Sequence, residues 1–191
     1  MHKETHLKNI VEVITGYTFR TALQSKDDAS LFVLQAKNIS DDIIVNETAL
    51  DGIDFENYWS KAIVKKGDIV ISSKGNFRAG IITHGFKKII AASSVYILRL
   101  KSKEITPEYL AIFLNSQKGQ RRISEKVTGA VINTILRKNL EDILITLPDI
   151  ETQKKIIRIY HTNKKIQEML IRKMTLMNSV SEGIIHQLIH T

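Results

Sequence analysis

Short apolar runs separated by glycine, proline and charged residues fill the first three quarters of the chain. Runs of this length, bounded by turn residues, favour strands. We therefore expect strands at residues 7–17, 31–36, 43–45, 69–71, 79–83, 94–100 and 140–147. Gly16 would end the first strand, and Lys66-Gly67-Asp68 would form a tight turn before the strand at 69–71.

A helix is expected after these strands, and its start obeys the capping rules. Thr106 is a suitable N-cap, Pro107 suits the first helical position, and Glu108 falls in the first turn, where a negative charge is favourable. Its buried face would consist of Tyr109, Leu110, Ile112 and Phe113. Residues 118–126 are expected to add one or two further helical turns, and residues 127–135 to form a loop or short strand.

The last quarter of the chain, residues 148–191, shows one clear period. Apolar side chains recur three and four residues apart, which is the seam of a helix that pairs with another helix. The seam consists of Ile156, Ile159, Ile166, Leu170, Met177, Val180 and Ile184. It is interrupted by Asn163, Lys173 and Gln187, and Asp149 is a suitable N-cap. Such a helix would be about 60 Å long, so we expect its seam to meet another helix rather than a compact domain of its own.

The expected architecture is therefore a mixed α+β fold. A twisted, mainly antiparallel sheet with helices would form a globular domain at residues 1–147, and a long coiled-coil helix would follow at residues 148–191. With 191 residues, of which 43% are hydrophobic, the chain can bury one core of ordinary size beside such an extension.

The net charge of +8 is unevenly distributed along the chain. Residues 27–60 hold eight acids against one lysine, whereas residues 61–101 hold nine Lys and Arg against one acid. Residues 118–138 add six cations against one acid. This segregation predicts a polyanion-binding face on one side of the domain and an acidic side that limits indiscriminate binding. Solvated charged loops are the alternative interpretation of each run.

Cysteine content and hydropathy predict the cellular location of the protein. The sequence contains no cysteine, so it has neither disulfides nor thiolate metal sites, which fits a reducing, intracellular setting. The start of the chain has no apolar signal segment, and no uncharged run approaches the roughly 18 residues that cross a membrane. We therefore expect a cytoplasmic protein without a membrane partner.

Motifs of catalysis and cofactor binding are missing from the sequence. It has no GxxxxGK[ST] or GxGxxG loop, no HExxH motif and no nucleophile elbow. No lysine has an acid two residues before it, so the Asp/Glu-x-Lys pair of many restriction-type nucleases is also missing. His186 and His190 stand four residues apart on the expected helix, but without a third ligand a solvated helix face is the better interpretation. We expect no catalysis, no cofactor and no metal.

Cationic and amide side chains on loops held by the sheet remain as candidate functional groups. Arginine reads guanine, asparagine reads adenine, and lysine mostly contacts phosphate. The candidate base readers are Asn38, Asn76 and Arg78. The candidate phosphate contacts are Lys37, Lys74, Lys87, Lys88, Arg121 and Arg122. For Tyr58 and Trp59, a small hydrophobic cluster is a better interpretation than a stacking site for a base.

These stretches, taken in order, resemble the DNA-specificity subunit of type I restriction-modification systems. The resemblance rests on KNIVEVITGYTF, VLQAKNIS, KKGDIVISSKGNFRAG, TPEYLAIFLNSQKGQ, TGAVINTILRKNLEDILITLP and PDIETQKKI. The last stretch is the most specific, because the family joins its target-recognition domain to a helix through a strand ending in proline and a Glu-x-Gln-x-x-Ile pattern. Here Thr152 stands where a second acid is common.

The resemblance has consequences for partners. Family members usually have two target-recognition domains and two conserved helices that pair antiparallel, whereas this chain has one of each. The resemblance therefore implies that two copies, or this copy and another half-subunit, pair through residues 148–191 and bind a symmetric, split site in double-stranded DNA. It also implies modification and restriction subunits as partners, which would carry out methyl transfer and cleavage. Asn163 would then fix the register of the paired helices.

Two other functions stay open at this point. One is a structural adaptor that uses the same helix for assembly and does not read DNA. The other is a nuclease or methyltransferase with an unfamiliar site, which the missing motifs disfavour.

Overall fold

The protein is represented by a computed structural model, which describes residues 3–20, 26, 29–54, 60–84, 88–128 and 133–189. It divides into two compact units, Met1–Gln153 and Lys154–Thr191. Within its described residues, the first unit holds two antiparallel sheets, a mixed sheet and four short helices, and the described part of the second unit is helical. The predicted α+β class, with mainly antiparallel strands and a long C-terminal helix, is confirmed.

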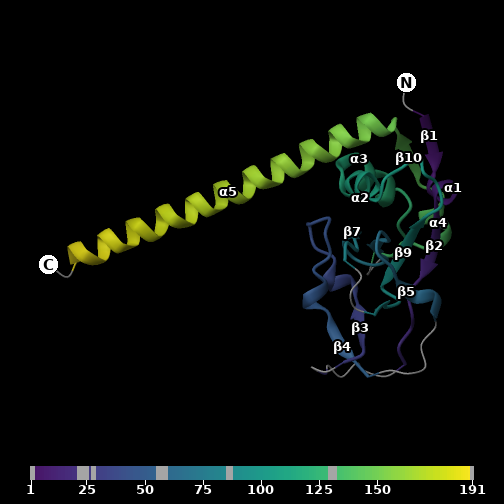
Figure 1. Cartoon of the computed structure of the whole chain (residues 1–191), viewed down its shortest axis with the longest axis horizontal. Helices are drawn as coiled ribbons and strands as arrows, with labels where there is room; N and C mark the ends of the chain where they lie inside the picture. The colour runs from purple at the N-terminus through teal and green to yellow at the C-terminus, as the bar shows by residue number, and fades with distance from the viewer. Residues whose placement is uncertain are drawn as a thin grey trace. The chain divides into compact units, whose positions relative to one another are not determined.

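Two four-stranded sheets contribute most of the strands of the first unit, and Figure 1 shows β3 and β4 of the second sheet at its lower end. The first sheet is antiparallel throughout and consists, in spatial order, of β2 (Val11–Thr15), β9 (Val95–Leu100), β6 (Ile69–Ser72) and β7 (Ala79–Ile81). The second consists of β4 (Asp51–Ile53), β3 (Leu31–Leu34), β8 (Ile89–Ala91) and β5 (Ile63–Val64), and in it β3 and β8 run parallel. The 3₁₀ turns found in the described segments are η1 (Ala36–Asn38), η2 (Glu47–Ala49) and η3 (Ser60–Ala62).

The main core brings together apolar residues from both four-stranded sheets. Its buried members are Ile14, Leu34, Ile39, Val45, Leu50, Val64, Val70, Ile82, Ile89, Ala91, Val95 and Ile97. All four residues of β6 are buried, because this strand has a neighbour on either side and is covered on both faces. A continuous apolar run such as Ile69-Val70-Ile71 is what a strand in this position requires.

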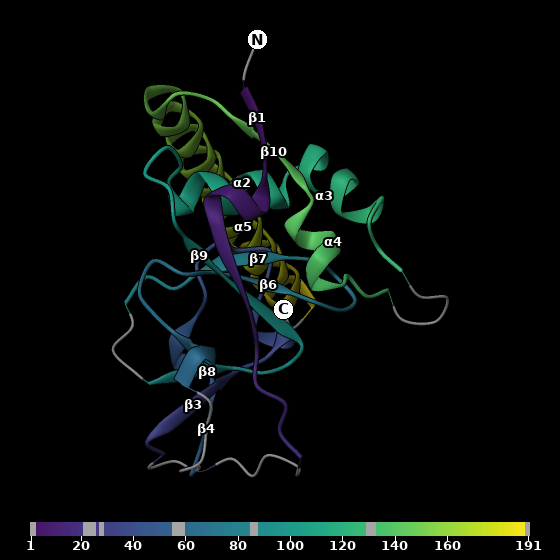
Figure 2. The ribbon, with the colours of Figure 1, turned by 90° about the vertical axis from the view of Figure 1, so that its right-hand side faces the viewer.

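The remaining elements of the first unit gather at one end of it. β1 (Lys3–His6) pairs antiparallel with β10 (Leu144–Leu147), so the first and last strands of the domain lie together. Figure 2 shows this pair with the helices at the end of the unit opposite β3 and β4. The helices are α1 (Leu7–Ile10), α2 (Pro107–Asn115), α3 (Gln117–Ser124) and α4 (Arg137–Glu141).

Helix α2 begins as predicted and is held against the first sheet. The Thr106 hydroxyl accepts a hydrogen bond from the backbone N–H of Tyr109, and Pro107 occupies the first turn. At its other end, the Asn115 side chain exchanges two 2.8 Å hydrogen bonds with the backbone of Ala79 in β7. The predicted buried face is confirmed for Tyr109, Leu110 and Phe113, whereas Ile112 is only half-buried and Leu114 is fully buried instead.

The predicted tight turn before β6 is confirmed and supports a buried ion pair. Gly67 has a φ of 84°, a left-handed conformation that favours glycine. The next residue, Asp68, is buried and receives hydrogen bonds from Arg99 Nε (2.9 Å) and Nη2 (2.6 Å). Its Oδ2 also accepts from the backbone N–H of Lys65 at 2.8 Å. The acid therefore fixes both the turn and the neighbouring strand β9.

Three predicted strands differ from the structure. Residues 7–10 form α1 before β2 begins, and residues 137–141 form α4 before β10 begins. In both places a short helix with buried apolar residues comes directly before a strand. The apolar residues of the helix and those of the strand follow each other closely in the sequence, so the two elements look like one longer strand. Residues 43–45 do not form a strand either, since Ile44 makes only an isolated bridge with Ile81.

The predicted long helix is α5, Ile150–Ile189, and Figure 1 shows it as one uninterrupted helix. Asp149 caps it, since Asp149 Oδ1 accepts a 2.8 Å hydrogen bond from the backbone N–H of Thr152. Six of the seven predicted seam residues are 45–60% exposed: Ile159, Ile166, Leu170, Met177, Val180 and Ile184. The seventh, Ile156, is half-buried. No helix in the described part of the chain is both long and apolar enough to cross a membrane.

Candidate nucleic-acid interface

The β6–β7 loop, residues 73–78, presents three of the predicted DNA-contacting residues. Gly75 has a φ of 72°, which lets the loop reverse direction. The Ser72 hydroxyl donates to the backbone oxygen of Asn76, and the backbone N–H of Arg78 donates to the same oxygen at 2.8 Å. Phe77 is buried and anchors the loop, so Lys74 and Asn76 are held outward, exposed to solvent.

Two segments that are distant in sequence hold this loop in position. The backbone N–H of Gly75 donates to the Asn133 carbonyl (2.9 Å), and the N–H of Ile135 donates to the Ser73 carbonyl (3.1 Å). From α3, the Gln120 side-chain amide donates to the Phe77 carbonyl at 2.8 Å. The loop is therefore part of a three-segment structure rather than an isolated hairpin tip.

A polar hollow of about 400 Å³ lies where these three segments meet. We call it the polar hollow; it is lined by Gly75, Asn76, Phe77, Arg78, Gln120, Ser124, Val127 and Asn133. Amide, guanidinium and hydroxyl groups all lie on its wall, so it offers both hydrogen-bond donors and acceptors. Of these residues, Asn76 and Arg78 were predicted from the sequence, whereas Gln120, Ser124 and Asn133 were not. The basic run at residues 118–138 was the signal that pointed to their neighbourhood.

Arg78 is bound to an acid from the acidic segment of the chain. Its Nε lies 2.8 Å from Asp41 Oδ1, and the two side chains are 38% and 86% exposed. Lys37 likewise lies 2.7 Å from Asp51. The acidic segment (residues 27–60) and the basic segment (residues 61–101) therefore meet at the Arg78–Asp41 pair, whereas the sequence predicted that they would occupy separate sides of the domain. The Lys37–Asp51 pair lies within the acidic segment. Exposed pairs of this kind contribute about 0–1 kcal/mol, so exchange for another anion costs little.

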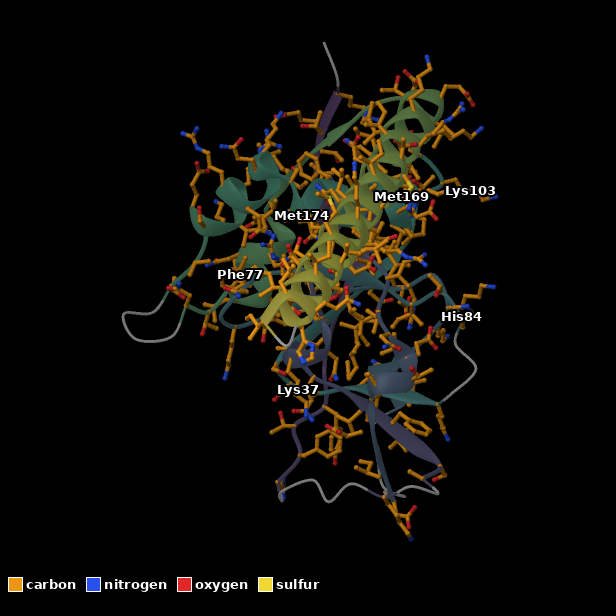
Figure 3. The ribbon with its side chains drawn as sticks, turned by 90° about the vertical axis from the view of Figure 1, so that its left-hand side faces the viewer. Lys37, Phe77, His84, Lys103, Met169 and Met174 are labelled. Carbon is orange, nitrogen blue, oxygen red and sulfur yellow. The ribbon has the colours of Figure 1, made fainter. Side chains whose placement is uncertain are left out.

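The 3₁₀ turn η1, which carries Lys37 and Asn38, is attached to the same part of the domain as the β6–β7 loop. The backbone N–H of Ala36 donates to the Ser94 hydroxyl (3.2 Å), and the N–H of Ser73 donates to the Ser94 carbonyl (2.8 Å). Asn38 is engaged locally, because its Oδ1 accepts from the Gln35 backbone at 2.9 Å and its Nδ2 donates to Ala49 O at 3.4 Å. Figure 3 labels one residue of each segment, Lys37 in η1 and Phe77 in the β6–β7 loop.

The two arginines on α3 have different surroundings. Arg121 is 82% exposed and forms an i,i+4 ion pair with Glu125 at 3.3 Å. Arg122 is only 19% exposed; it donates to Glu4 (2.6 Å) and to the backbone oxygen of Leu144 (2.5 Å), and its guanidinium lies 5.9 Å from the centre of the Phe113 ring. Arg122 therefore connects α3 to β1 and β10.

The other sequence-predicted residues lie away from the polar hollow or outside the described residues. Lys88 is exposed at the start of β8, where its carbonyl accepts from Phe32. Lys87, Tyr58, Trp59 and His190 lie outside the described residues. Within the part of the chain that is described, no three His, Asp or Glu side chains gather in a way that could hold a metal ion.

Comparison with known families decides which family the chain belongs to. The family model of the type I restriction modification DNA specificity domain matches residues 2–174. This chain belongs to that family. No curated protein matches the chain.

Solved structures from type I restriction-modification systems have a similar fold. The chain is similar to the S subunit of a type I restriction-modification system from M. genitalium (16% identity, TM-score 0.58, 85% of this chain and 39% of that chain). It is also similar to the HsdS subunit from Thermoanaerobacter tengcongensis (14%, 0.62, 89% and 39%). A third solved structure, described as showing the complex assembly and conformational transition of the type I R-M system, matches with 16% sequence identity and a TM-score of 0.68. The match covers 89% of this chain and 40% of that chain. The chain therefore spans about 40% of the length of each of these three solved chains.

Proposed function

We propose that this specificity-family chain binds double-stranded DNA sequence-specifically and selects the DNA site for a type I restriction-modification system. The observation that carries the proposal is the polar hollow, where side chains from three segments converge beside exposed cations. Amide and guanidinium groups match the donors and acceptors of base edges, and cations suit phosphates. The family description, a DNA specificity domain, supports the same function.

Each residue of the interface has a role in this proposal. Arg78 exchanges Asp41 for a guanine, which offers a bidentate acceptor, and the exposed amides of Asn76 and Asn133 read adenine. Lys74 and Arg121 contact phosphates on either side of the polar hollow, and Lys37 does so from η1. A phosphate contact of Lys88 and a base contact of Asn38 stay predictions, and for Asn38 that contact requires both of its local hydrogen bonds to break.

We propose further that two helices α5 pair, either from two copies or from this chain and another half-subunit. Seam side chains such as Ile159 (60% exposed) and Leu170 (55%) leave most of their apolar area in water. Fully burying one such side chain contributes about 1.5–3 kcal/mol, so a helix with several of them gains by covering the seam. Asn163, exposed at a seam position, would fix the register.

Charge favours an antiparallel arrangement of the pair. Residues 154–173 hold seven Lys and Arg and one acid, whereas residues 174–189 hold no Lys or Arg. Parallel pairing would set two basic halves against each other, and antiparallel pairing sets each basic half against one whose only charged residue of the Asp, Glu, Lys and Arg type is Glu182. Two domains held by such a pair would bind a split site with two-fold symmetry. Modification and restriction subunits are the proposed catalytic partners, as the family resemblance implies.

Selection of bound duplexes from a random library by the full-length chain tests the DNA-binding proposal. We expect enrichment of two related half-sites at fixed separation. Arg78→Ala should relax the preference at one base position, whereas Lys74→Ala should weaken binding to all duplexes equally and lower the salt slope by about 1. Lys103→Ala is the charge-matched control, because Lys103 is exposed and lies on the opposite side of the domain from Phe77 in Figure 3. Equal, sequence-independent losses for Arg78→Ala and Lys74→Ala would contradict the role of Arg78.

A structural adaptor is the second candidate function, and the exposed seam of α5 favours it because helix pairing does not require DNA. An adaptor would form the helix pair and retain no duplex selectively from the random library. The library selection therefore distinguishes the two functions.

A further inference from the structure

We infer that one side of α5 is a second DNA-contacting surface, on which Arg158, Lys165 and Arg172 bind phosphates of the duplex that the domains hold. This inference rests on the proposed function and extends it. It assigns to the helix a direct part in DNA binding, in addition to pairing.

The three cations form a straight row along the helix, which we call the basic stripe. They are seven residues apart, so at 1.5 Å and about 100° per residue successive side chains are about 10.5 Å apart and the row deviates by only about 40° over its length. All three are exposed. Lys154, four residues before Arg158, stands on the same side of the helix.

The basic stripe stays exposed when the seam is covered. With about 100° per residue, it lies roughly a third of a turn away from the row that contains Ile159, Ile166 and Leu170. Positions this far from a coiled-coil seam face solvent in a paired helix. Pairing therefore leaves the basic stripe available, whereas it buries the apolar side chains.

Acidic side chains within α5 are too few to neutralise the positive charges of the basic stripe. Glu168 is the only acid between residues 154 and 173, three residues after Lys165 and four before Arg172. Among the described residues, no ion pair joins Glu168 to Lys165 or to Arg172, whereas i,i+4 ion pairs form between Arg121 and Glu125 in α3 and between Arg137 and Glu141 in α4. The row of charges thus extends beyond what one acid can compensate.

Duplex DNA is the partner that this arrangement fits. DNA carries one negative charge per about 1.7 Å of its axis, so cations about 10 Å apart meet a phosphate in any register. The row contains neither amides nor aromatic rings, which suits contact without base reading. A duplex already bound by two domains is tethered to the assembly, and tethering raises the effective concentration at weak secondary contacts to about the millimolar range.

A salt titration with the full-length chain tests the inference independently of any selected site. On a random-sequence duplex of about 40 base pairs, the variant with Arg158→Gln, Lys165→Gln and Arg172→Gln should lower the magnitude of the slope of log affinity against log salt by about 1–3. The charge-preserving variant Arg158→Lys with Arg172→Lys should keep the slope of the wild type. An unchanged slope in the triple variant would overturn the inference.

A crosslinking experiment locates the contact directly, since the chain has no native cysteine. A photo-crosslinker attached through Lys165→Cys should react with the duplex, and one attached through Asn178→Cys, an exposed and uncharged position on the same helix, should not. Equal yields at both positions, or none at residue 165, would refute a specific surface and assign the basic stripe to an acidic protein partner or to solvent. Failure of the library selection with a positive crosslink would overturn sequence-specific reading but leave the basic stripe as a DNA contact.

Discussion

The carboxylate of Glu4 is a point where three elements meet. Its Oε1 accepts hydrogen bonds from Arg122 Nη2 (2.6 Å) and Lys118 Nζ (3.3 Å) in α3, and from the Thr146 hydroxyl (3.2 Å) in β10. The hydrogen bond from Arg122, followed by that from Lys118, lowers the pKa of Glu4 from 4.5 to about 2. The charged form of Glu4 therefore stabilises the junction of β1, β10 and α3.

This pKa predicts how stability depends on pH. A carboxyl group with a lowered pKa contributes fully above its ordinary value of 4.5, and the contribution is lost as pH falls from about 4.5 towards 2. Glu4→Gln should therefore be clearly less stable than wild type at pH 6–7, and the difference should narrow towards pH 3. Urea unfolding of both proteins across this range measures it, with Glu125→Gln as the control for loss of an exposed carboxylate. A difference that stays constant with pH would contradict the assignment.

At the scale of elements, Gln153 explains the Glu-x-Gln-x-x-Ile pattern at the start of α5. Its side chain is fully buried. Its Nε2 donates to the carbonyls of Glu104 (2.7 Å) and Pro148 (2.9 Å), and its Oε1 accepts from the backbone N–H of Thr106 at 2.9 Å. One amide thus satisfies backbone groups just before α2 begins and just after β10 ends, and it fastens the first turn of α5 to the domain.

Replacing Gln153 should destabilise the domain strongly. Gln153→Ala removes the partner of one buried and two part-buried backbone groups. An unpaired buried group costs about 1–3 kcal/mol, so we expect a loss of about 2 kcal/mol or more. Gln153→Glu keeps an acceptor for Thr106 but offers no donor to the two carbonyls and buries a charge, so it should be at least as harmful. Gln167→Ala, at an exposed position of the same helix, should change stability by less than about 0.5 kcal/mol. Thermal unfolding of the three variants measures these differences, and a Gln153→Ala protein as stable as Gln167→Ala would refute the role.

Elements with a strong local signal could be predicted from the sequence. Thr106 with Pro107, the Gly67 turn and the period of α5 each depend on residues within a few positions of one another. α1 and α4 could not be predicted, because each is a single buried helical turn fused to a strand. What decides them is tertiary packing, as when the side chain of Asn139 in α4 donates to the Lys126 carbonyl.

In the candidate interface, too, some residues could be predicted from local sequence and others depend on tertiary contacts. Lys74, Asn76 and Arg78 share one loop and were identified together from local sequence. Gln120 and Asn133 enter the polar hollow through hydrogen bonds between the β6–β7 loop and distant segments, which no local pattern contains. Likewise, Arg121 and Arg122 look equivalent in the sequence, yet Arg122 is bound to Glu4, 118 residues away.

At the scale of the whole molecule, the exposed seam predicts self-association. The full-length chain should sediment as a dimer, and helix melting should shift to higher temperature with increasing protein concentration. Leu170→Lys should dissociate the dimer, because it places a charge in the apolar seam, and Thr175→Lys, on the opposite face of α5, should not. Asn163→Ile should strengthen association and loosen the choice of register. A monomer at high concentration, as judged by light scattering, would contradict homodimer formation.

The pairing of β1 with β10 also determines when the domain can be completed during synthesis. Lys3 pairs with Leu147, so the first strand has no partner until nearly 150 residues have been made. At about 5–20 residues per second, this delay is roughly 7–30 s. During that time the neighbouring Leu7 and Ile10, both buried in the finished domain, have no completed core to enter. A chain that ends before residue 147 therefore lacks the strand that closes the domain, so translation must reach the start of the helix before the domain can close.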